Sequence, residues 1–199
     1  MGRHKNTDLR QKQIVAGFAA AISELGYAGA SIAVIAQNAE LTPGLLHYHF
    51  KSKEDILRAL IKEMSAYISD RVAMKLEGLR KPTPISRIEQ VIGAFLDLDS
   101  GSNLVFVRCW TVIFAEAATN IKVRGVVHRG LLEQLDEIKK VAQEIWNEDK
   151  KRSVDELASL ILAAIQGYIL IGTVAPDLIP RGSASKMVSS MVFSLGKIS

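Results

Sequence analysis

The strongest constraint on this chain of 199 residues is a helical spacing of apolar residues, interrupted at intervals by proline and glycine. Near the start, Ile14, Phe18 and Ile22 follow one another at four-residue steps, and Gly26 comes soon after. Such spacing puts the three side chains on one face of a helix, and glycine is a common residue at a helix end. Hydrophobic residues make up 48% of the chain, which is enough for a core. We therefore predict an all-α fold.

The same reasoning predicts further helices. Three of them begin at good capping residues, namely Ser31, Thr42 and Ser52, and the last of these runs to about residue 78. After the prolines of Lys81–Pro84, the periodicity predicts helices at 84–98, 103–119, 122–148, 153–175 and 184–196. Taken in isolation, Val123–Val127 is also compatible with a strand.

Positive charge is concentrated in the first quarter of the chain. Residues 1–53 carry six basic and three acidic side chains, whereas the remainder carries 19 basic and 18 acidic ones. Three of the four histidines lie in the same segment. A basic end on a nearly neutral body favours an anionic partner at that end. An imbalance of three charges is also compatible with chance.

Several classes of function are disfavoured by what the sequence lacks. The single cysteine, Cys109, rules out an intramolecular disulfide and a cysteine-rich zinc site, and it suits a reducing cytoplasm. No glycine-rich phosphate loop, nucleophile elbow or metal-ligand motif occurs. We therefore expect no enzyme, no cofactor and no metal site. Two alternatives stay open: a nucleophile pair of Cys109 with His128, and a helical adaptor that binds only protein.

One segment has the composition of a membrane span. Leu157–Ala175 is nineteen residues long and contains few polar side chains. It has no aromatic belt at its two ends, and no second span accompanies it. A helix buried in a core and in a subunit interface explains it better. A short apolar run at Ile14–Ile22 is part of a periodic helix rather than a secretory signal. We expect a cytoplasmic protein with no membrane partner.

The most informative segment runs from Ser31 to Lys53. Two short helices separated by Glu40–Thr42 have the proportions of a helix-turn-helix. In this motif the second helix is short, and its exposed face enters the major groove of DNA. Leu46 and Phe50, four residues apart, are suited to pin the second helix to its neighbours.

The residues of this segment resemble the signature of the TetR family of bacterial transcriptional regulators. The stretch SIAVIAQNAELTPGLLHYHFKSKEDIL (31–57) carries the family pattern as Ser31, Ile35-Ala36, Ala39–Thr42, Gly44, the His47–Phe50 cluster, Lys53 and Ile56-Leu57. Two positions depart from it. Glu40 replaces the usual turn glycine, so it must either adopt a left-handed conformation or change the turn. His47 replaces the more common first tyrosine of the cluster.

The resemblance implies a helix-turn-helix domain over residues 1–52 and a bundle for effector binding and dimerisation over 53–199. It also implies a homodimeric repressor that reads a pseudo-palindromic operator in double-stranded DNA and is released by a small molecule. We expect Thr42, Tyr48 and Lys53 to hold phosphates, while Gly44, Leu45 and His49 meet bases. The full set of expected DNA contacts is Ser31, Thr42, Pro43, Gly44, Leu45, His47, Tyr48, His49 and Lys53.

The sequence offers two kinds of candidate effector contact. Phe106, Trp110 and Phe114 form an aromatic stripe at four-residue steps, and either core packing or a ligand wall explains it. Polar groups on otherwise apolar helices are the second kind, namely Arg108, Glu116, Gln166 and Tyr168, and a solvated or interface position explains each of them better than a ligand contact. Parts of the second half resemble the branch of the family that contains the repressor of choline-to-glycine-betaine genes, which suggests a quaternary ammonium effector held by cation–π contacts. The last two helices are expected to form the dimer interface, with Met187, Met191, Val192 and Leu195 as an apolar stripe.

Overall fold

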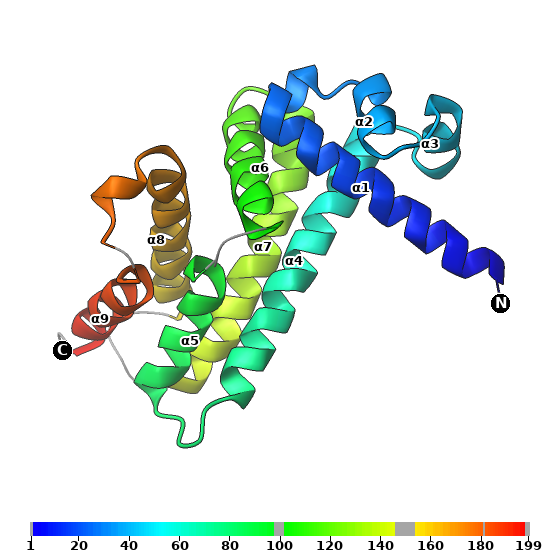
Figure 1. Cartoon of the computed structure of the whole chain (residues 1–199). Coiled ribbons are helices and arrows are strands. Elements are labelled where there is room, and N and C mark those ends of the chain that lie inside the picture. Colours follow the sequence, from blue (N-terminus) through cyan, green and yellow to red (C-terminus); the bar gives the residue numbers. More distant parts are fainter. Residues whose placement is uncertain (1, 98–101, 146–153, 181, 198–199) are drawn as a thin grey trace. The chain divides into compact units, whose positions relative to one another are not determined.

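The computed structural model describes residues 2–97, 102–145, 154–180 and 182–197. Throughout these ranges the regular elements are helices, drawn in Figure 1. In chain order they are α1 (Gly2–Gly29), α2 (Ile32–Asn38), α3 (Pro43–His49), α4 (Lys53–Glu77), α5 (Pro84–Leu96), α6 (Ser102–Ala117), α7 (Ile121–Ile145), α8 (Val154–Val174), the 3₁₀ turn η1 (Pro176–Leu178) and α9 (Ala184–Lys197). The prediction of an all-α fold is confirmed, and Val123–Val127 is helical.

The chain forms two compact units. Unit 1 contains residues 1–64 and 101–130, and unit 2 contains residues 65–100 and 131–199. They do not divide the chain after residue 52, where we expected a domain boundary, because α4 continues from unit 1 into unit 2 and α6 packs against α1 within unit 1. A functional division at residue 52 stays a prediction.

Unit 1 is built on close contact between α1 and α2. A Cβ atom on Gly17 would lie 2.8 Å from the backbone nitrogen of Ala39 and 2.9 Å from the carbonyl oxygen of Ile35. The amide of Asn38 donates to the Gly17 carbonyl oxygen at 3.4 Å. Glycine at this position therefore lets the two helix backbones touch, which fixes where α2 and the following turn lie on α1.

The predicted helix end at Gly26 is visible as a kink. Gly26 has φ 73° and ψ 170°, outside the helical region, and a last turn continues to Gly29. On the preceding part of α1, Ile14, Phe18 and Ile22 are fully buried, as the four-residue spacing predicted. The helix also packs against α6, where the Ser23 hydroxyl donates to the Val105 carbonyl oxygen at 3.2 Å.

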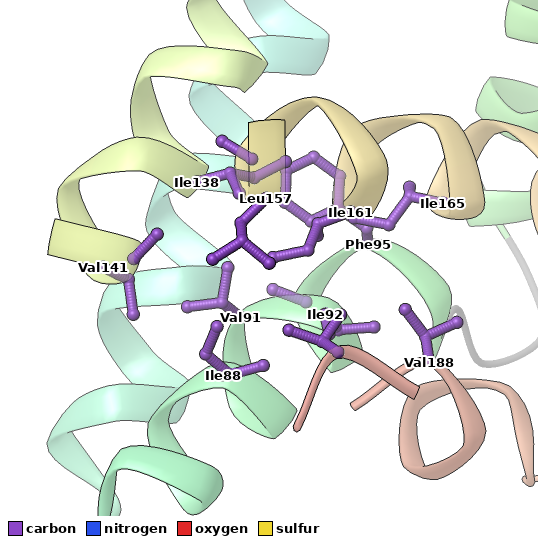
Figure 2. Packing of buried hydrophobic residues seen from close by; sticks show 14 of the residues in the cluster. Ile88, Val91, Ile92, Phe95, Ile138, Val141, Leu157, Ile161, Ile165 and Val188 are labelled. Carbon is purple, nitrogen blue, oxygen red and sulfur yellow. The ribbon is translucent and has the colours of Figure 1, made fainter. Parts of the chain in front are cut away.

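The core of unit 2 is an aliphatic cluster contributed by five helices. Figure 2 shows its central side chains, which come from α5, α7, α8 and α9. The labelled members are Ile88, Val91, Ile92, Phe95, Ile138, Val141, Leu157, Ile161, Ile165 and Val188. Val192 belongs to the same cluster and is fully buried. It therefore faces inward rather than joining an exposed stripe with Met187 and Met191, and the side chain of Leu195 lies outside the described residues.

Within unit 2, Arg71 ties α4 to the end of α5. Its Nε donates to the carbonyl oxygen of Ala94 at 2.9 Å, and its Nη2 donates to that of Asp97 at 2.7 Å. Carbonyl groups at a helix C-terminus lack partners in their own helix, so a cation there is doubly favourable. Lys75 adds an ion pair with the Asp97 carboxylate at 3.1 Å.

The apolar helix α8 has two different faces. It is long and apolar enough to cross a membrane by length and composition, and no other helix among the described residues is. One face enters the core of unit 2 through Leu157, Ala158, Ile161 and Ile165. The other exposes Leu170, Ile171 and Val174. A core helix with a second apolar face explains this composition without a bilayer.

Candidate nucleic-acid interface

Each helix of the predicted motif begins at a capped residue. Ser31 adopts an extended conformation before α2, and its hydroxyl accepts from the backbone nitrogen of Val34 at 3.3 Å. Thr42 does the same for α3, accepting from the backbone nitrogen of Leu45 at 3.3 Å. Pro43 follows in the first turn, where the missing N–H costs nothing. Both caps are those predicted.

The short helix α3 has one buried anchor and a broad exposed face. Leu46 is fully buried and Phe50, just after the helix, is 7% exposed, so these two side chains hold α3 on unit 1 as expected. The side chains of Thr42, Pro43, His47 and Tyr48 are exposed, as is Gly44. Leu45 and His49 are half-buried.

Within this exposed face, the Tyr48 side chain extends into solvent. It is 73% exposed, and its ring makes an edge-on contact with that of His49 at 5.1 Å between centroids. Nothing lies within 4 Å of a Cβ atom built on Gly44, so this backbone is open to an approaching molecule. The face therefore combines a bare backbone, a hydroxyl, imidazoles and a phenol, which are groups that pair with phosphates and base edges.

The turn between α2 and α3 is made by Glu40 in a left-handed conformation. Its φ is 54°, and it is the non-glycine residue with positive φ in the part of the chain that the structure describes. This resolves the alternative posed by the sequence: the turn is kept, and glutamate adopts the conformation that glycine usually takes. For an L-residue this conformation carries a steric cost.

The start of α4, directly after α3, is capped by Ser52. The backbone nitrogen of Asp55 donates to the Ser52 hydroxyl at 3.1 Å, and that hydroxyl donates to the Asp55 carboxylate at 2.7 Å. Arg58 pairs with the same carboxylate. The hydrogen bond from Ser52, followed by that from Arg58, lowers the pKa of Asp55. A carboxylate that stays ionised in the first turn is favourable at the positive end of the helix dipole.

Lys53 lies where the resemblance expects it, but its amine already has partners. Nζ donates to the carbonyl oxygen of Tyr27 at 2.5 Å and sits 4.1 Å from the centre of the Tyr27 ring. Burial lowers the pKa of Lys53, while the charges of Glu116 and Glu54 raise it. No sequence pattern predicts this contact, because the two residues are 26 positions apart and cation–π pairs have no fixed spacing.

The expected effector residues fall into both units. Phe106, Trp110 and Phe114 lie on α6 in unit 1, whereas Gln166 and Tyr168 lie on α8 in unit 2. Trp110 is buried and its ring centroid is 6.3 Å from that of Phe114, which is 41% exposed.

In unit 2, Gln166 donates to the side-chain oxygen of Gln134 at 3.0 Å, and Tyr168 packs against the aliphatic core. The polar partner Gln134 was not anticipated. It lies 32 residues from Gln166, and nothing in its spacing marks it. The role of these residues in binding a ligand stays a prediction.

The candidate nucleophile Cys109 is enclosed by apolar neighbours. It is fully buried, and desolvation raises the pKa of its thiol to about 12. Such a thiol is protonated at neutral pH and is a poor nucleophile. His128 is exposed. Among the described residues, no group of three or more His, Cys, Asp and Glu side chains is arranged to hold a metal ion.

Two capped short helices, a tight turn and an exposed second helix define a helix-turn-helix DNA-binding protein. Comparison with known proteins supports this class. Residues 14–60 match the model of the bacterial regulatory proteins of the tetR family. The chain carries the regulatory domain of this family over those residues, and it is similar in sequence to the transcriptional regulators named BetI.

Two of these relatives, both HTH-type transcriptional regulators BetI, illustrate the extent of the match. The Serratia proteamaculans protein is 28% identical over 109 residues, which is 55% of this chain and 54% of that protein. The Klebsiella pneumoniae protein is 26% identical over 178 residues, which is 85% of this chain and 90% of that protein.

Solved structures share the fold along the chain. A Rhodococcus sp. protein described as a TetR-family transcriptional regulator has a TM-score of 0.82 at 19% identity, covering 96% of this chain and all of that one. A Saccharomonospora viridis transcriptional regulator in complex with choline has a TM-score of 0.71 at 19% identity, covering 94% and 95%.

The left-handed Glu40 generates a stability prediction. Glu40→Gly should raise the free energy of unfolding by about 0.5–1 kcal/mol, because relief of about 1–2 kcal/mol of steric cost exceeds the added backbone entropy of glycine. Chemical denaturation followed by circular dichroism measures the difference. Glu40→Ala is the matched control, since it removes the carboxylate but keeps the Cβ atom. An equal gain in both variants would assign the effect to charge and contradict the prediction.

Proposed function

We propose that this protein is a homodimeric repressor that binds a pseudo-palindromic operator through α3 and is released by a small molecule. The observation that carries the proposal is the exposed face of α3, where Gly44 is open and Tyr48 projects into solvent. A helix of seven residues held at its inner face has the shape that fits the major groove. Such a regulator acts where the chromosome lies, in the cytoplasm of a bacterium.

The contacts divide between positioning and reading. Thr42 and Tyr48 supply hydroxyl groups near the start and the exposed side of α3, which suits phosphate oxygens, and Ser31 does so at the start of α2. Free backbone N–H groups at these helix starts add favourable dipoles. Gly44, Leu45 and His49 are placed for base edges, with Pro43 and His47 beside them. Lys53 is treated separately below.

The dimer proposal rests on apolar side chains left exposed in unit 2. They lie on α8, η1 and α9, three elements of which α8 packs against each of the other two. The largest are Leu170, Ile171, Val174, Leu178, Met187 and Met191. Monomeric soluble proteins rarely leave so much apolar surface on adjoining elements in water. A second copy of the chain would cover it, and twofold symmetry would set two α3 helices about 34 Å apart for one face of the DNA.

The effector proposal rests on the aromatic pair of α6. Trp110 and the partly exposed Phe114 supply ring faces of the kind that hold quaternary ammonium groups. The Saccharomonospora viridis neighbour was crystallised in complex with choline, which supports testing the same class of ligand. Phe106 extends the stripe. Gln166 and Tyr168 lie in unit 2, and their role as ligand contacts stays a separate prediction from the sequence.

Gly44→Ala separates folding from DNA recognition. A Cβ atom at this position meets nothing within the protein, and alanine favours helix over glycine by about 1 kcal/mol, so the variant should be as stable as the parent or more so. The added methyl group would stand between α3 and the groove, so affinity should fall about tenfold or more. The measurement is fluorescence anisotropy with a duplex selected from a random library by the parent protein.

Gly125→Ala serves as the control, because its Cβ atom also meets nothing and the position lies on α7. Undiminished affinity in Gly44→Ala would contradict the proposal that α3 approaches DNA closely at this residue. If the parent protein selected no duplex, the DNA-binding proposal as a whole would be refuted.

Met187→Asp tests the dimer surface. Met187 is 54% exposed on α9, so the substitution is harmless in a monomer but buries a charge twice in a symmetric dimer. Burying an unpaired charge costs several kcal/mol, and we expect the dimer dissociation constant to rise roughly a thousandfold. Analytical ultracentrifugation measures it. Met74→Asp, at a methionine of α4 that is 64% exposed, should leave the dimer intact. Equal behaviour of the two variants would place the interface elsewhere.

Choline binding tests the effector class. Choline should raise the melting temperature and quench tryptophan fluorescence, whereas its neutral isostere 3,3-dimethylbutan-1-ol should do neither, because only a cation is attracted by the ring faces. Phe114→Leu should weaken the response about threefold or more while keeping the apolar volume. A parent protein that responds to neither compound does not bind this class of ligand at α6.

A further inference from the structure

Five charged or aromatic side chains from four helices interact in unit 1, through a hydrogen bond, an ion pair and the charges of two carboxylates. Tyr27 comes from the end of α1, Lys53 and Glu54 from the start of α4, Glu116 from the end of α6 and Lys122 from the start of α7. None of them lies on the exposed face of α3. Because α4 begins four residues after α3 ends, whatever fixes the start of α4 also constrains the reading helix.

Lys53 is the centre of this cluster. Its ammonium group is held on one side by the Tyr27 carbonyl oxygen at 2.5 Å and on the other by the Tyr27 ring at 4.1 Å. The Tyr27 side chain itself is 6% exposed, and its ring packs edge-on against Phe18 with 6.1 Å between centroids. Lys53 therefore ties the start of α4 to a buried residue near the end of α1.

The corner between α6 and α7 is built to present two side chains at a fixed place. Arg124 reaches back to the end of α6, donating to the carbonyl oxygens of Ala117 at 3.0 Å and of Ala118 at 2.6 Å. The side-chain oxygen of Asn120 accepts from the backbone nitrogens of Lys122 and Val123 and so caps α7. Both helix ends at this corner are thus satisfied by side chains of the corner itself.

The corner faces the start of α4 with charges of both signs. Lys122 pairs with Glu54 at 3.7 Å, and the Asn120 amide donates to the Glu116 carboxylate at 2.9 Å, which fixes that carboxylate. Burial, followed by the charges of Glu54 and Glu116, raises the pKa of Tyr27 to about 12. The same two carboxylates stabilise the charged form of Lys53.

We propose that Lys53 and Glu116 are positioning residues for operator binding, which hold the start of α4, and with it α3, in the orientation that the DNA groove requires. The proposal rests on the DNA-binding function proposed above. It assigns the half-buried Lys53 amine to a contact within unit 1 rather than to a phosphate. It also makes a carboxylate of α6 necessary for affinity to a polyanion.

The sign of this effect makes the proposal testable. Removing a negative charge from a DNA-binding protein strengthens its attraction to phosphates when nothing else changes. Glu116→Gln removes one negative charge and keeps an oxygen that accepts from Asn120. If Glu116 only added bulk charge, the variant would bind DNA as tightly as the parent or more tightly. A positioning role requires the opposite result.

The first experiment compares Glu116→Gln with Glu24→Gln on the duplex selected by the parent protein. Glu24 is an exposed residue of α1 in the same unit, so the change in net charge is equal. We expect Glu116→Gln to lose about fivefold or more in affinity, the usual size of a coupling between sites, while Glu24→Gln keeps or slightly gains affinity. Affinity of Glu116→Gln at or above that of Glu24→Gln overturns the proposal.

A second readout distinguishes a positioning lysine from a phosphate ligand. Each phosphate contact contributes about 0.9 to the slope of the logarithm of the binding constant against the logarithm of the salt concentration. Lys53→Met should therefore weaken binding with the slope unchanged. A slope reduced by about 0.9 would assign Lys53 to a phosphate and overturn its positioning role.

Asn120→Ser guards against misfolding as an explanation. Serine still caps α7, but it is too short to hold Glu116, and no charge changes. With a melting temperature and circular dichroism spectrum like those of the parent, this variant should also lose about threefold or more in affinity. Unchanged affinity in Asn120→Ser and Glu116→Gln, with the parent protein still binding its duplex, would refute the inference while leaving the DNA-binding function intact.

Discussion

The stability of α3 depends on its surroundings, because a helix of seven residues does not form alone in water. It has one fully buried side chain, Leu46, and a buried residue at its end, Phe50. The other side chains of α3 are therefore not needed for the core and can contact another molecule. Because so few of its residues are buried, the orientation of α3 depends on the segments at its two ends. These are the turn at Glu40 before it and the start of α4 after it. Much of unit 1 serves to fix these two points.

The parts of this arrangement that follow local rules were predictable. The caps Ser31 and Thr42, the proline after Thr42 and the anchors Leu46 and Phe50 are all encoded within a few residues, and each lies as expected. The contacts that hold α4 were not predictable. Lys53 meets Tyr27 across 26 residues, through a carbonyl group and a ring face that leave no spacing signal. Side-chain pairs between helices depend on the packing itself, which periodicity does not specify.

The same limit appears in the apolar residues of unit 2. Periodicity marks which face of α9 is apolar, but it does not say which apolar residues enter the core and which stay outside. Val192 is fully buried, whereas Met187 and Met191 remain exposed on the same helix. On α8 the apolar surface exceeds what one core can cover, so the sequence resembles a membrane span. Length and composition cannot distinguish a lipid neighbour from a protein neighbour, whereas the four buried residues of α8 show that one face lies against protein.

Helix α6 carries residues of both proposals, the one for effector binding and the one for positioning α4. It packs against α1 through Ser23 and Val105, and it carries Trp110 and Phe114 along its length. Near its end it carries Glu116, whose charge acts on Lys53 and Tyr27. All of these residues belong to unit 1. A ligand that alters how α6 lies therefore needs no change in unit 2 to affect the start of α4. In its proposed role Glu116 acts by charge over a distance, so a small displacement would change its interaction with Lys53 smoothly, whereas the part-buried contact between Lys53 and Tyr27 is either made or broken. The interaction between Glu116 and Lys53 would then make DNA affinity change gradually with the displacement of α6. Loss of the contact between Lys53 and Tyr27 would set the largest change in affinity that a ligand can cause.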